Sequence, residues 1–192
     1  DELALHVVVR DITERKQMEH QVRQLAFFDT LTQLPNRRLL NDRLSQAIAA
    51  TRRNERYGAV LFLDLDNFKP LNDLFGHTMG DLLLVEVAQR LTSCVREVDT
   101  VARFGGDEFV IALPYCALPQ ALHWAEQLRR SLVQSSPTLA NHSLPSGTLT
   151  LSAGVADILL GNTDDLLAQG EALFQAADAA LYEAKEQGRN RI

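Results

Sequence analysis

Residues 59–66 read Ala-Val-Leu-Phe-Leu-Asp-Leu-Asp, and this stretch decides the fold. Its first five residues are all apolar and do not alternate with polar ones, which is typical of a central strand that is covered on both faces. The run ends in two acids, Asp64 and Asp66. We therefore expect a buried strand that delivers carboxylates to one end of a sheet.

Downstream of this strand the chain alternates between helical and strand patterns. Short strands are expected over residues 101–103, 109–113 and 148–155. Helices are expected over residues 81–95, 118–133 and 171–187. Residues 105–108 have the composition of a hairpin turn, residues 135–146 suggest a loop or hairpin arm, and Gly188 occupies the usual helix-stop position.

The order of these elements is strand, helix, strand, strand, helix, strand. This order predicts an α+β fold with a split βαβ (βαββαβ) core, in which helices pack on one face of a mainly antiparallel sheet. The layout is palm-like, as in nucleotide cyclases and polymerases, and the analogy favours metal chemistry without fixing the product.

Two helices are expected upstream of the central strand. Asn36 is suited to cap a helix over residues 37–52, whose apolar face contains Leu39, Leu40, Leu44 and Ile48. Asp11 and Glu14 have the spacing of a capping pair, which predicts a polar helix over residues 14–28. The apolar stripe of that helix, formed by Met18, Val22 and Leu25, is either an ordinary packed face or a coiled-coil seam.

Composition indicates one main globular domain. The chain has 192 residues, of which 46% are hydrophobic and 23% charged, and its formal net charge is −6. The acidic balance argues against DNA or RNA as a partner, but a nucleotide that arrives with metal ions is compatible with it. Cys94 and Cys116 are expected to be free thiols in a reducing compartment. No apolar run is long enough to cross a bilayer, so this segment is expected to be cytoplasmic without membrane contact, although a longer parent could be membrane-attached.

The predicted topology gathers three carboxylates. Asp64 ends the first strand, and Asp107 and Glu108 lie at the turn between two strands that neighbour it. Like charges at close range persist only when a proton or cation relieves them, and magnesium ions are a standard solution in phosphoryl transfer. Each acid taken singly is more typical of a strand end or turn without chemistry.

The words around these acids resemble the GGDEF family of diguanylate cyclases. The segment over residues 103–109 reads Arg-Phe-Gly-Gly-Asp-Glu-Phe, which matches the family signature letter for letter. Further matches, in the expected order, are the Asp-Thr-Leu-Thr-Gln-Leu-Pro-Asn-Arg segment at 29–37, the acidic and basic words at 64–81, and the closing words at 180–185 and 188–191. The resemblance covers about residues 25–192.

The resemblance implies a reaction and a cofactor. The domain would condense two GTP into cyclic di-GMP plus two pyrophosphates, as a metal-dependent homodimer. Asp64, the Leu65 carbonyl and Asp107 would hold Mg²⁺, with Mn²⁺ possible, because hard oxygen ligands suit these ions. Glu108 would be a further ligand or would help to deprotonate the attacking hydroxyl. Asp66 is expected to be a solvated turn acid.

The resemblance also implies substrate contacts. Lys69, Lys185 and Arg189 would contact the triphosphate, and Lys69 is counted with Asp107 and Glu108 among the catalytic groups. Gly105 and Gly106 would let the backbone approach a phosphate. The guanine-reading pair would be Asn72 and Asp81, because an amide and a carboxylate together match the edge of guanine. His77 is expected to be structural.

A separate site for the product is expected ahead of the signature. The word over residues 96–99, Arg-Glu-Val-Asp, resembles the family's product-inhibition site, in which Arg96 and Asp99 would bind cyclic di-GMP. Two departures from the family pattern, Ala153 and Ala176, bear only on local packing.

Residues 1–24 are interpreted as the end of an upstream sensor domain and its linker helix, followed by the GGDEF domain at 25–192. The apolar, β-branched run over residues 3–9 predicts a strand, and together with the segment at 11–16 it resembles the tail of a PAS domain. Two alternatives to a diguanylate cyclase remain. One is a GTP-binding or cyclic di-GMP-binding regulatory module without turnover, and the other is a cyclase with a different product.

Overall fold

The structure is a computed structural model that describes residues 11–54, 57–134, 138–139, 142–143, 149–158 and 165–192. The strand expected over 3–9 and most of the arm expected over 135–146 lie outside these residues. The helices are α1 (Thr13–Phe27), α2 (Arg37–Asn54), α3 (Phe68–Phe75), α4 (His77–Ser93), α5 (Leu118–Gln134) and α6 (Leu166–Glu186). The strands are β1 (Gly58–Asp66), β2 (Thr100–Gly105), β3 (Glu108–Pro114), β4 (Thr138–Leu139), β5 (His142–Ser143) and β6 (Thr150–Asp157).

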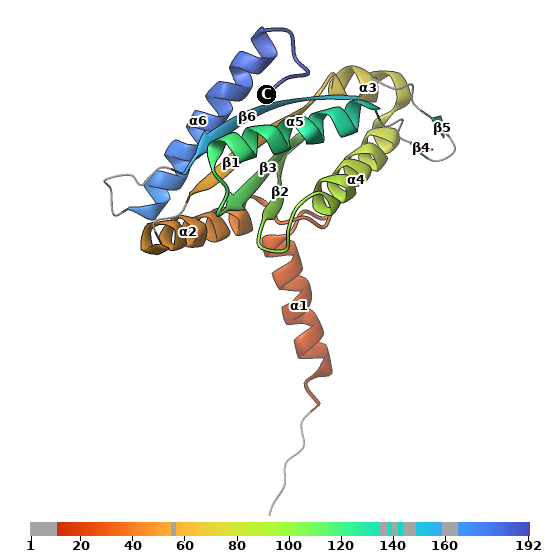
Figure 1. The fold of residues 1–192 in the computed structure, drawn as a ribbon. Helices are drawn as coiled ribbons and strands as arrows, with labels where there is room; N and C mark the ends of the chain where they lie inside the picture. The colour runs from red at the N-terminus through yellow and green to blue at the C-terminus, as the bar shows by residue number, and fades with distance from the viewer. Residues whose placement is uncertain (1–10, 55–56, 135–137, 140–141, 144–148, 159–164) are drawn as a thin grey trace, which may run out of the picture.

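The main sheet has the strand order β2-β3-β1-β6, and each neighbouring pair is antiparallel. Strand β3 lies between β1 and β2, so the connection through α3 and α4 spans a split βαβ unit (Figure 1). The predicted α+β core is therefore confirmed. Strand β1 is the centre of the sheet, and all of its residues are buried.

Helices cover both faces of the sheet, so the expectation of one covered face is wrong. Leu61 and Leu63 pack with α3, α4 and α5, whereas Val60 and Phe62 pack with α2 and α6. The reason is the period of two along an extended strand: a continuous apolar run points large side chains to both sides, and each side must be covered.

Helix α3 was not predicted. It begins directly after β1, behind Asn67 in a left-handed conformation with φ 60°, and it contains Pro70 within its first turn, where proline is tolerated. Gly76 separates α3 from α4 with φ 85°. Helix α4 consequently begins at His77 instead of Asp81.

Helix α6 begins earlier than its sequence pattern predicted, because the Asp165 side chain caps its first turn by accepting hydrogen bonds from the backbone N–H groups of Leu167 and Ala168. The helix lies closely on β6 at Gly154, where an added Cβ would come within 1.9 Å of the Ala177 carbonyl oxygen. Glycine at this position lets α6 lie close to the sheet. The last turn of α6 consequently reaches the end of β1, where Lys185 pairs with Asp64.

Helix α1 extends away from the domain (Figure 1) and buries none of its residues. The side chains of its apolar stripe, Met18, Val22 and Leu25, are 65%, 62% and 68% exposed. The stripe is therefore not packed against the domain in the way that an ordinary apolar helix face would be. Among the described helices, none is both long enough and apolar enough to cross a membrane.

Candidate functional site

The acids converge at the ends of β1 and β3. Asp64 lies opposite Glu108 in the β1–β3 register, and the backbone N–H of Leu65 donates to the carbonyl oxygen of Asp107 over 3.3 Å. A cleft of about 290 Å³ opens at this point. Its lining comprises Asp64, Leu65, Asp66, Asn67, Phe68, Lys69, Pro70, Asp107, Lys185 and Arg189.

Asp64 is buried and has a cationic partner. Lys185, in the last turn of α6, forms an ion pair with it over 2.8 Å. Burial raises the pKa of Asp64, and the nearby carboxylates of Asp107 and Asp66 raise it further, while Lys185 acts in the opposite direction and does not compensate fully. Burial also raises the pKa of Glu108, again with contributions from Asp64 and Asp107. Negative charge on Asp64 and Glu108 is therefore unfavourable in the folded chain, and a bound cation would stabilise it.

Glu108 opens onto a different surface from Asp107. It lines a second cleft, of about 440 Å³, with Asp178, Tyr182 and other residues of α6, and Lys185 lines both clefts. Within the described residues, no three histidine, cysteine, aspartate or glutamate side chains converge as a metal cage. The carboxylates are thus electrostatically coupled, but Glu108 does not share the cleft of Asp64 and Asp107.

The donors in the first cleft fit a hard divalent ion. Two carboxylates, Asp64 and Asp107, and the backbone at Leu65 line one concave space, and oxygen ligands completed by water are what Mg²⁺ prefers. Burial and the neighbouring carboxylates raise the pKa of Asp64, so a cation bound beside it would stabilise its charged form. Metal binding remains part of the proposal below.

Two of the predicted triphosphate residues, Lys69 and Arg189, line the same cleft. Lys69 comes from α3, and Arg189 follows the end of α6. Gly188, with φ 114°, ends α6 as predicted, in a Schellman pattern: Gly188 N–H donates to the Lys185 carbonyl and Arg189 N–H to the Ala184 carbonyl. The described chain therefore brings Lys69, Lys185 and Arg189 together around Asp64.

The predicted guanine-reading residues lie on the neighbouring helices α3 and α4. Asn72 packs against Gly80, where an added Cβ would meet its Oδ1 atom at 1.7 Å. This Oδ1 is buried and has no hydrogen-bond partner among the described residues. Asp81 follows directly and is exposed. The Asn72 Oδ1 atom is therefore covered at Gly80, whereas Asp81 is exposed to solvent.

Asp66 differs from its prediction. It is 2% exposed, not solvated. It accepts hydrogen bonds from Thr150, Ser152 and the backbone N–H of Asn190. The prediction was wrong because β1 stays extended through Asp66, where this residue pairs with Thr150 of β6 and is covered by that strand.

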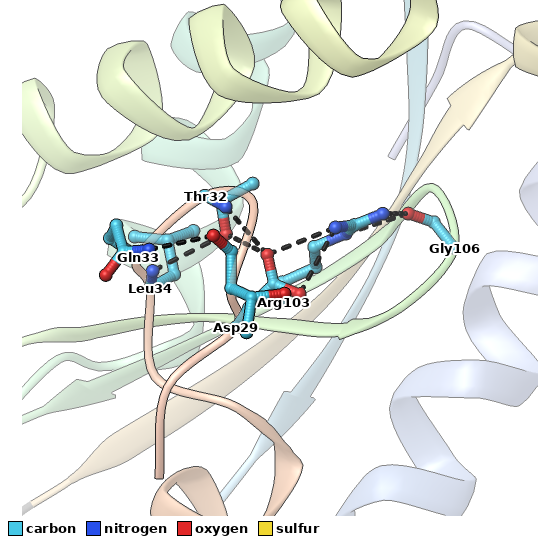
Figure 2. A network of polar contacts seen from close by, with 7 residues as sticks. Asp29, Thr32, Gln33, Leu34, Arg103 and Gly106 are labelled. Carbon is cyan, nitrogen blue, oxygen red and sulfur yellow. Dashed lines mark hydrogen bonds and ion pairs between the residues drawn. The ribbon is translucent and has the colours of Figure 1, made fainter. Parts of the chain in front are cut away.

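The signature turn is held by Arg103 (Figure 2). The Arg103 Nε and one terminal nitrogen donate to the Gly106 carbonyl oxygen over 2.9 and 2.7 Å, and the other terminal nitrogen pairs with Asp29 over 3.1 Å. Asp29 also accepts from the Thr32 N–H and hydroxyl. Gly106 has φ 40°, which favours glycine at this position.

Asp29 is anchored as a carboxylate. Burial by itself would raise its pKa, but the hydrogen bonds from Thr32 and Arg103 outweigh burial and lower the pKa below the ordinary value. Because α1 ends at Phe27, one guanidinium thus joins the segment after α1 to the signature turn. The sequence marked both words as family motifs, but nothing in it indicated that they contact each other.

Arg96 and Asp99 lie at the other end of β2 from the signature. They form a bidentate pair, with Arg96 Nε and a terminal nitrogen 3.1 and 2.9 Å from the carboxylate oxygens of Asp99. The Asp99 side chain is 3% exposed and that of Arg96 is 57% exposed. A cleft of about 230 Å³ beside them also contains Arg43 and Glu97. The two residues are therefore adjacent and face a cavity, as a shared ligand would require.

Comparison with known proteins identifies the family. The family model described as "Diguanylate cyclase, GGDEF domain" matches residues 26–191. The bifunctional diguanylate cyclase/cyclic di-GMP phosphodiesterase MucR of Pseudomonas aeruginosa is 44% identical over 87% of this chain, and diguanylate cyclase DgcM of Escherichia coli is 39% identical over 96%. The chain spans only 23% and 42% of the lengths of these two relatives.

A solved structure gives the same answer. The coiled coil and GGDEF domain of DgcB from Caulobacter crescentus, in complex with c-di-GMP, is similar with a TM-score of 0.82 and 30% identity, covering 94% of this chain and 91% of that chain. The four-stranded antiparallel sheet with its packed helices is the fold of solved GGDEF domains. The chain belongs to the GGDEF family of diguanylate cyclases.

Arg103→Lys should weaken the joint between α1 and the signature turn. A lysine ammonium is a compact donor that cannot serve Gly106 and Asp29 in one planar fork, so we expect the free energy of unfolding to fall by about 1–3 kcal/mol. Urea denaturation measures this change, and Arg15→Lys, in an exposed pair on α1, is the matched control. Equal stability of the two variants would show that the network contributes little.

Proposed function

We propose that this chain is the catalytic domain of a diguanylate cyclase that condenses two GTP into cyclic di-GMP and releases two pyrophosphates. The observation that carries the proposal is the shared cleft: two carboxylates, Asp64 and Asp107, face three cations, Lys69, Lys185 and Arg189. Acids suit a divalent ion, cations suit phosphate oxygens, and a nucleoside triphosphate with its metal needs both within one space.

Asp64, Asp107 and the Leu65 carbonyl would hold Mg²⁺ or Mn²⁺, and the bound ion would supply Lewis-acid stabilisation of phosphate oxygens. Lys69 and Arg189, which both line the cleft, would bind the triphosphate. Lys185 is 32% exposed in its pair with Asp64, so its ammonium can reach a phosphate oxygen in the same cleft. The backbone at Gly105 and Gly106 would come close to a phosphate without side chains in the way.

The chemical step is a nucleotidyl transfer. The 3′-oxygen of one GTP bonds to the α-phosphorus of the other, and the bond from that phosphorus to the pyrophosphate oxygen breaks. Glu108, which lies opposite Asp64 in the β1–β3 register, would accept the hydroxyl proton or serve as a further metal ligand. The same step with the two nucleotides exchanged closes the ring.

Guanine selectivity is proposed for Asn72 and Asp81. Asn72 is half-buried on α3, and its amide would donate to the acceptors of guanine. The Asp81 carboxylate would accept from the N–H groups of guanine, and adenine does not present that pattern. A cyclase with another base is therefore the weaker alternative.

The reaction requires two copies of the domain, since one cleft holds one nucleotide. The exposed stripe of Met18, Val22 and Leu25 on α1 supports assembly through a parallel coiled coil. Residues 1–24 would then be the end of a PAS sensor domain and its linker, and 25–192 the cyclase domain of a longer, cytoplasmic or membrane-attached protein that does not bind nucleic acid.

Arg96 and Asp99 are proposed to bind cyclic di-GMP as a feedback inhibitor. Their bidentate pair and the adjoining cleft support a site for guanine and phosphate at a distance from the acids along β2. Binding there would stabilise an arrangement in which the two half-sites do not face each other.

The domain with GTP and magnesium should produce cyclic di-GMP and pyrophosphate, and Asp107→Asn should reduce the rate by about a hundredfold or more, because one metal-facing carboxylate is lost. Chromatography of the nucleotides measures the product. Asp42→Asn, at an exposed position of α2, is the control for the loss of one acid. GTP binding without any product, under conditions that enforce dimers, would favour the regulatory module.

Specific activity should rise with protein concentration, because an isolated α1 is too short to hold a strong dimer. Replacement of residues 1–24 by a strong parallel coiled coil in matching register should raise activity at low concentration, and a shifted register should not. Light scattering and rate are measured on the same dilution series. Constant specific activity of a demonstrably monomeric protein would contradict the two-copy reaction.

Arg96→Ala should leave the initial velocity nearly unchanged and weaken inhibition by added cyclic di-GMP, since only the inhibited arrangement loses contacts. Arg130→Ala, which removes another largely exposed arginine paired with an acid on its own element, is the control outside this cleft. Thermal unfolding checks the fold of both variants, because Asp99 loses a hydrogen-bonded partner. Superimposable inhibition curves for Arg96→Ala and the unaltered chain would exclude this site as the inhibitory one.

A further inference from the structure

Asp66 is a buried carboxylate without a cation. Within the described residues it forms no ion pair, and three donors surround it: the Thr150 hydroxyl at 2.8 Å, the Ser152 hydroxyl at 2.7 Å and the Asn190 N–H at 3.0 Å. Two of these donors belong to β6, and the third belongs to the chain after α6. Burying a carboxylate is costly unless hydrogen bonds compensate, so an acid retained here is set to hold these segments together.

The segment after α6 needs such support. Gly188, Arg189 and Asn190 have φ of 114°, 62° and 51°, which places two consecutive non-glycine residues in the left-handed region. The Asn190 N–H is shared between Asp66 Oδ2 and the Ser152 hydroxyl oxygen, the latter at 3.1 Å. The Arg191 carbonyl then accepts from the Ala153 N–H over 2.9 Å.

Arg189 gains its place from this turn. Its side chain lines the cleft of Asp64 and Lys69, and its backbone lies between the Schellman bonds of α6 on one side and the Asp66 contact on the other. Arg189 lies beyond the end of α6, so its place depends on the Schellman bonds before it and on the contacts of Asn190 after it, which are made with Asp66, Ser152 and Arg129.

We propose that Asp66 is a positioning residue: it holds the turn at 188–191 against β6 so that Arg189 is presented to the triphosphate of the bound nucleotide. The inference rests on the proposed function, since it gives Arg189 a phosphate to bind. Asp66 borders the cleft but is only 2% exposed, and donors engage both of its carboxylate oxygens, so it would not contact the nucleotide directly. Its effect passes through the Asn190 N–H and the backbone of Arg189.

The test separates positioning from general damage by the affinity for two ligands. Isothermal titration with magnesium present measures the binding of 3′-deoxy-GTP, which lacks the attacking hydroxyl, and of GMP, which lacks the terminal phosphates. Asp66→Ala should weaken binding of 3′-deoxy-GTP on the order of tenfold, as expected for the loss of one charge-assisted contact, and should leave the affinity for GMP nearly unchanged. Asp66→Asn keeps the shape and one acceptor oxygen, so it should lose less.

The double variant Asp66→Ala/Arg189→Ala gives the decisive comparison. If Asp66 acts through Arg189, the double variant binds 3′-deoxy-GTP no more weakly than Arg189→Ala alone. Thr100→Val, which removes another buried hydroxyl from the same sheet, is the control for a loss of stability without a change in affinity. If Asp66→Ala does not fold, the same comparison is made with Asp66→Asn.

Additive effects in the double variant, or an equal loss of affinity for GMP, would overturn the positioning role. Unchanged affinity of the Asp66 variants for 3′-deoxy-GTP would overturn it too, while leaving the proposed cyclase intact. A chain that binds no 3′-deoxy-GTP before any substitution would overturn both proposals.

Discussion

Two carboxylates buried two residues apart, Asp64 and Asp66 at the end of β1, are the constraint on which the structure depends. Each is compensated differently. Asp64 pairs with Lys185 over 2.8 Å and still has a raised pKa, whereas Asp66 is surrounded by neutral donors from β6 and the chain after α6. The protein does not fully stabilise the charged form of Asp64, which suits a group that binds a cation. The second is fully engaged, which suits a structural one.

The helices are arranged to meet this constraint. Gly154 lets α6 descend onto β6, so that Lys185 reaches Asp64 and the turn after Gly188 reaches Asp66. On the other side of the acids, Arg103 ties the signature turn to Asp29 and hence to the end of α1. A change in the direction of α1 would therefore act on the turn that carries Asp107 through Arg103, whose guanidinium pairs with Asp29 and whose backbone N–H donates to the Pro35 carbonyl oxygen.

Sequence patterns predicted the parts of the fold that depend on local chemistry. The apolar run into Asp64, the hairpin at the signature and the stop at Gly188 are each determined by a few adjacent residues, and all three are confirmed. Helix α3 was not predicted because proline is more typical of loops than of helices, although Pro70 lies in the first turn, where proline is tolerated. Asp66 was misjudged because its burial comes from β6 and Asn190, which are far away in the sequence. Family words indicated which residues matter at the site, but the contact between Asp29 and Arg103 is long-range and had no local signal.

Our central proposal is that Asp64 and Asp107 bind a divalent ion together with a nucleotide. Thermal unfolding of the chain, with and without millimolar magnesium, tests it most directly, since a ligand that binds only the folded state raises the melting temperature. We predict a magnesium-dependent rise that GTP increases, that Asp42→Asn retains and that Asp64→Asn abolishes. A melting temperature that magnesium leaves unchanged, or a rise of equal size in Asp64→Asn, would contradict the account.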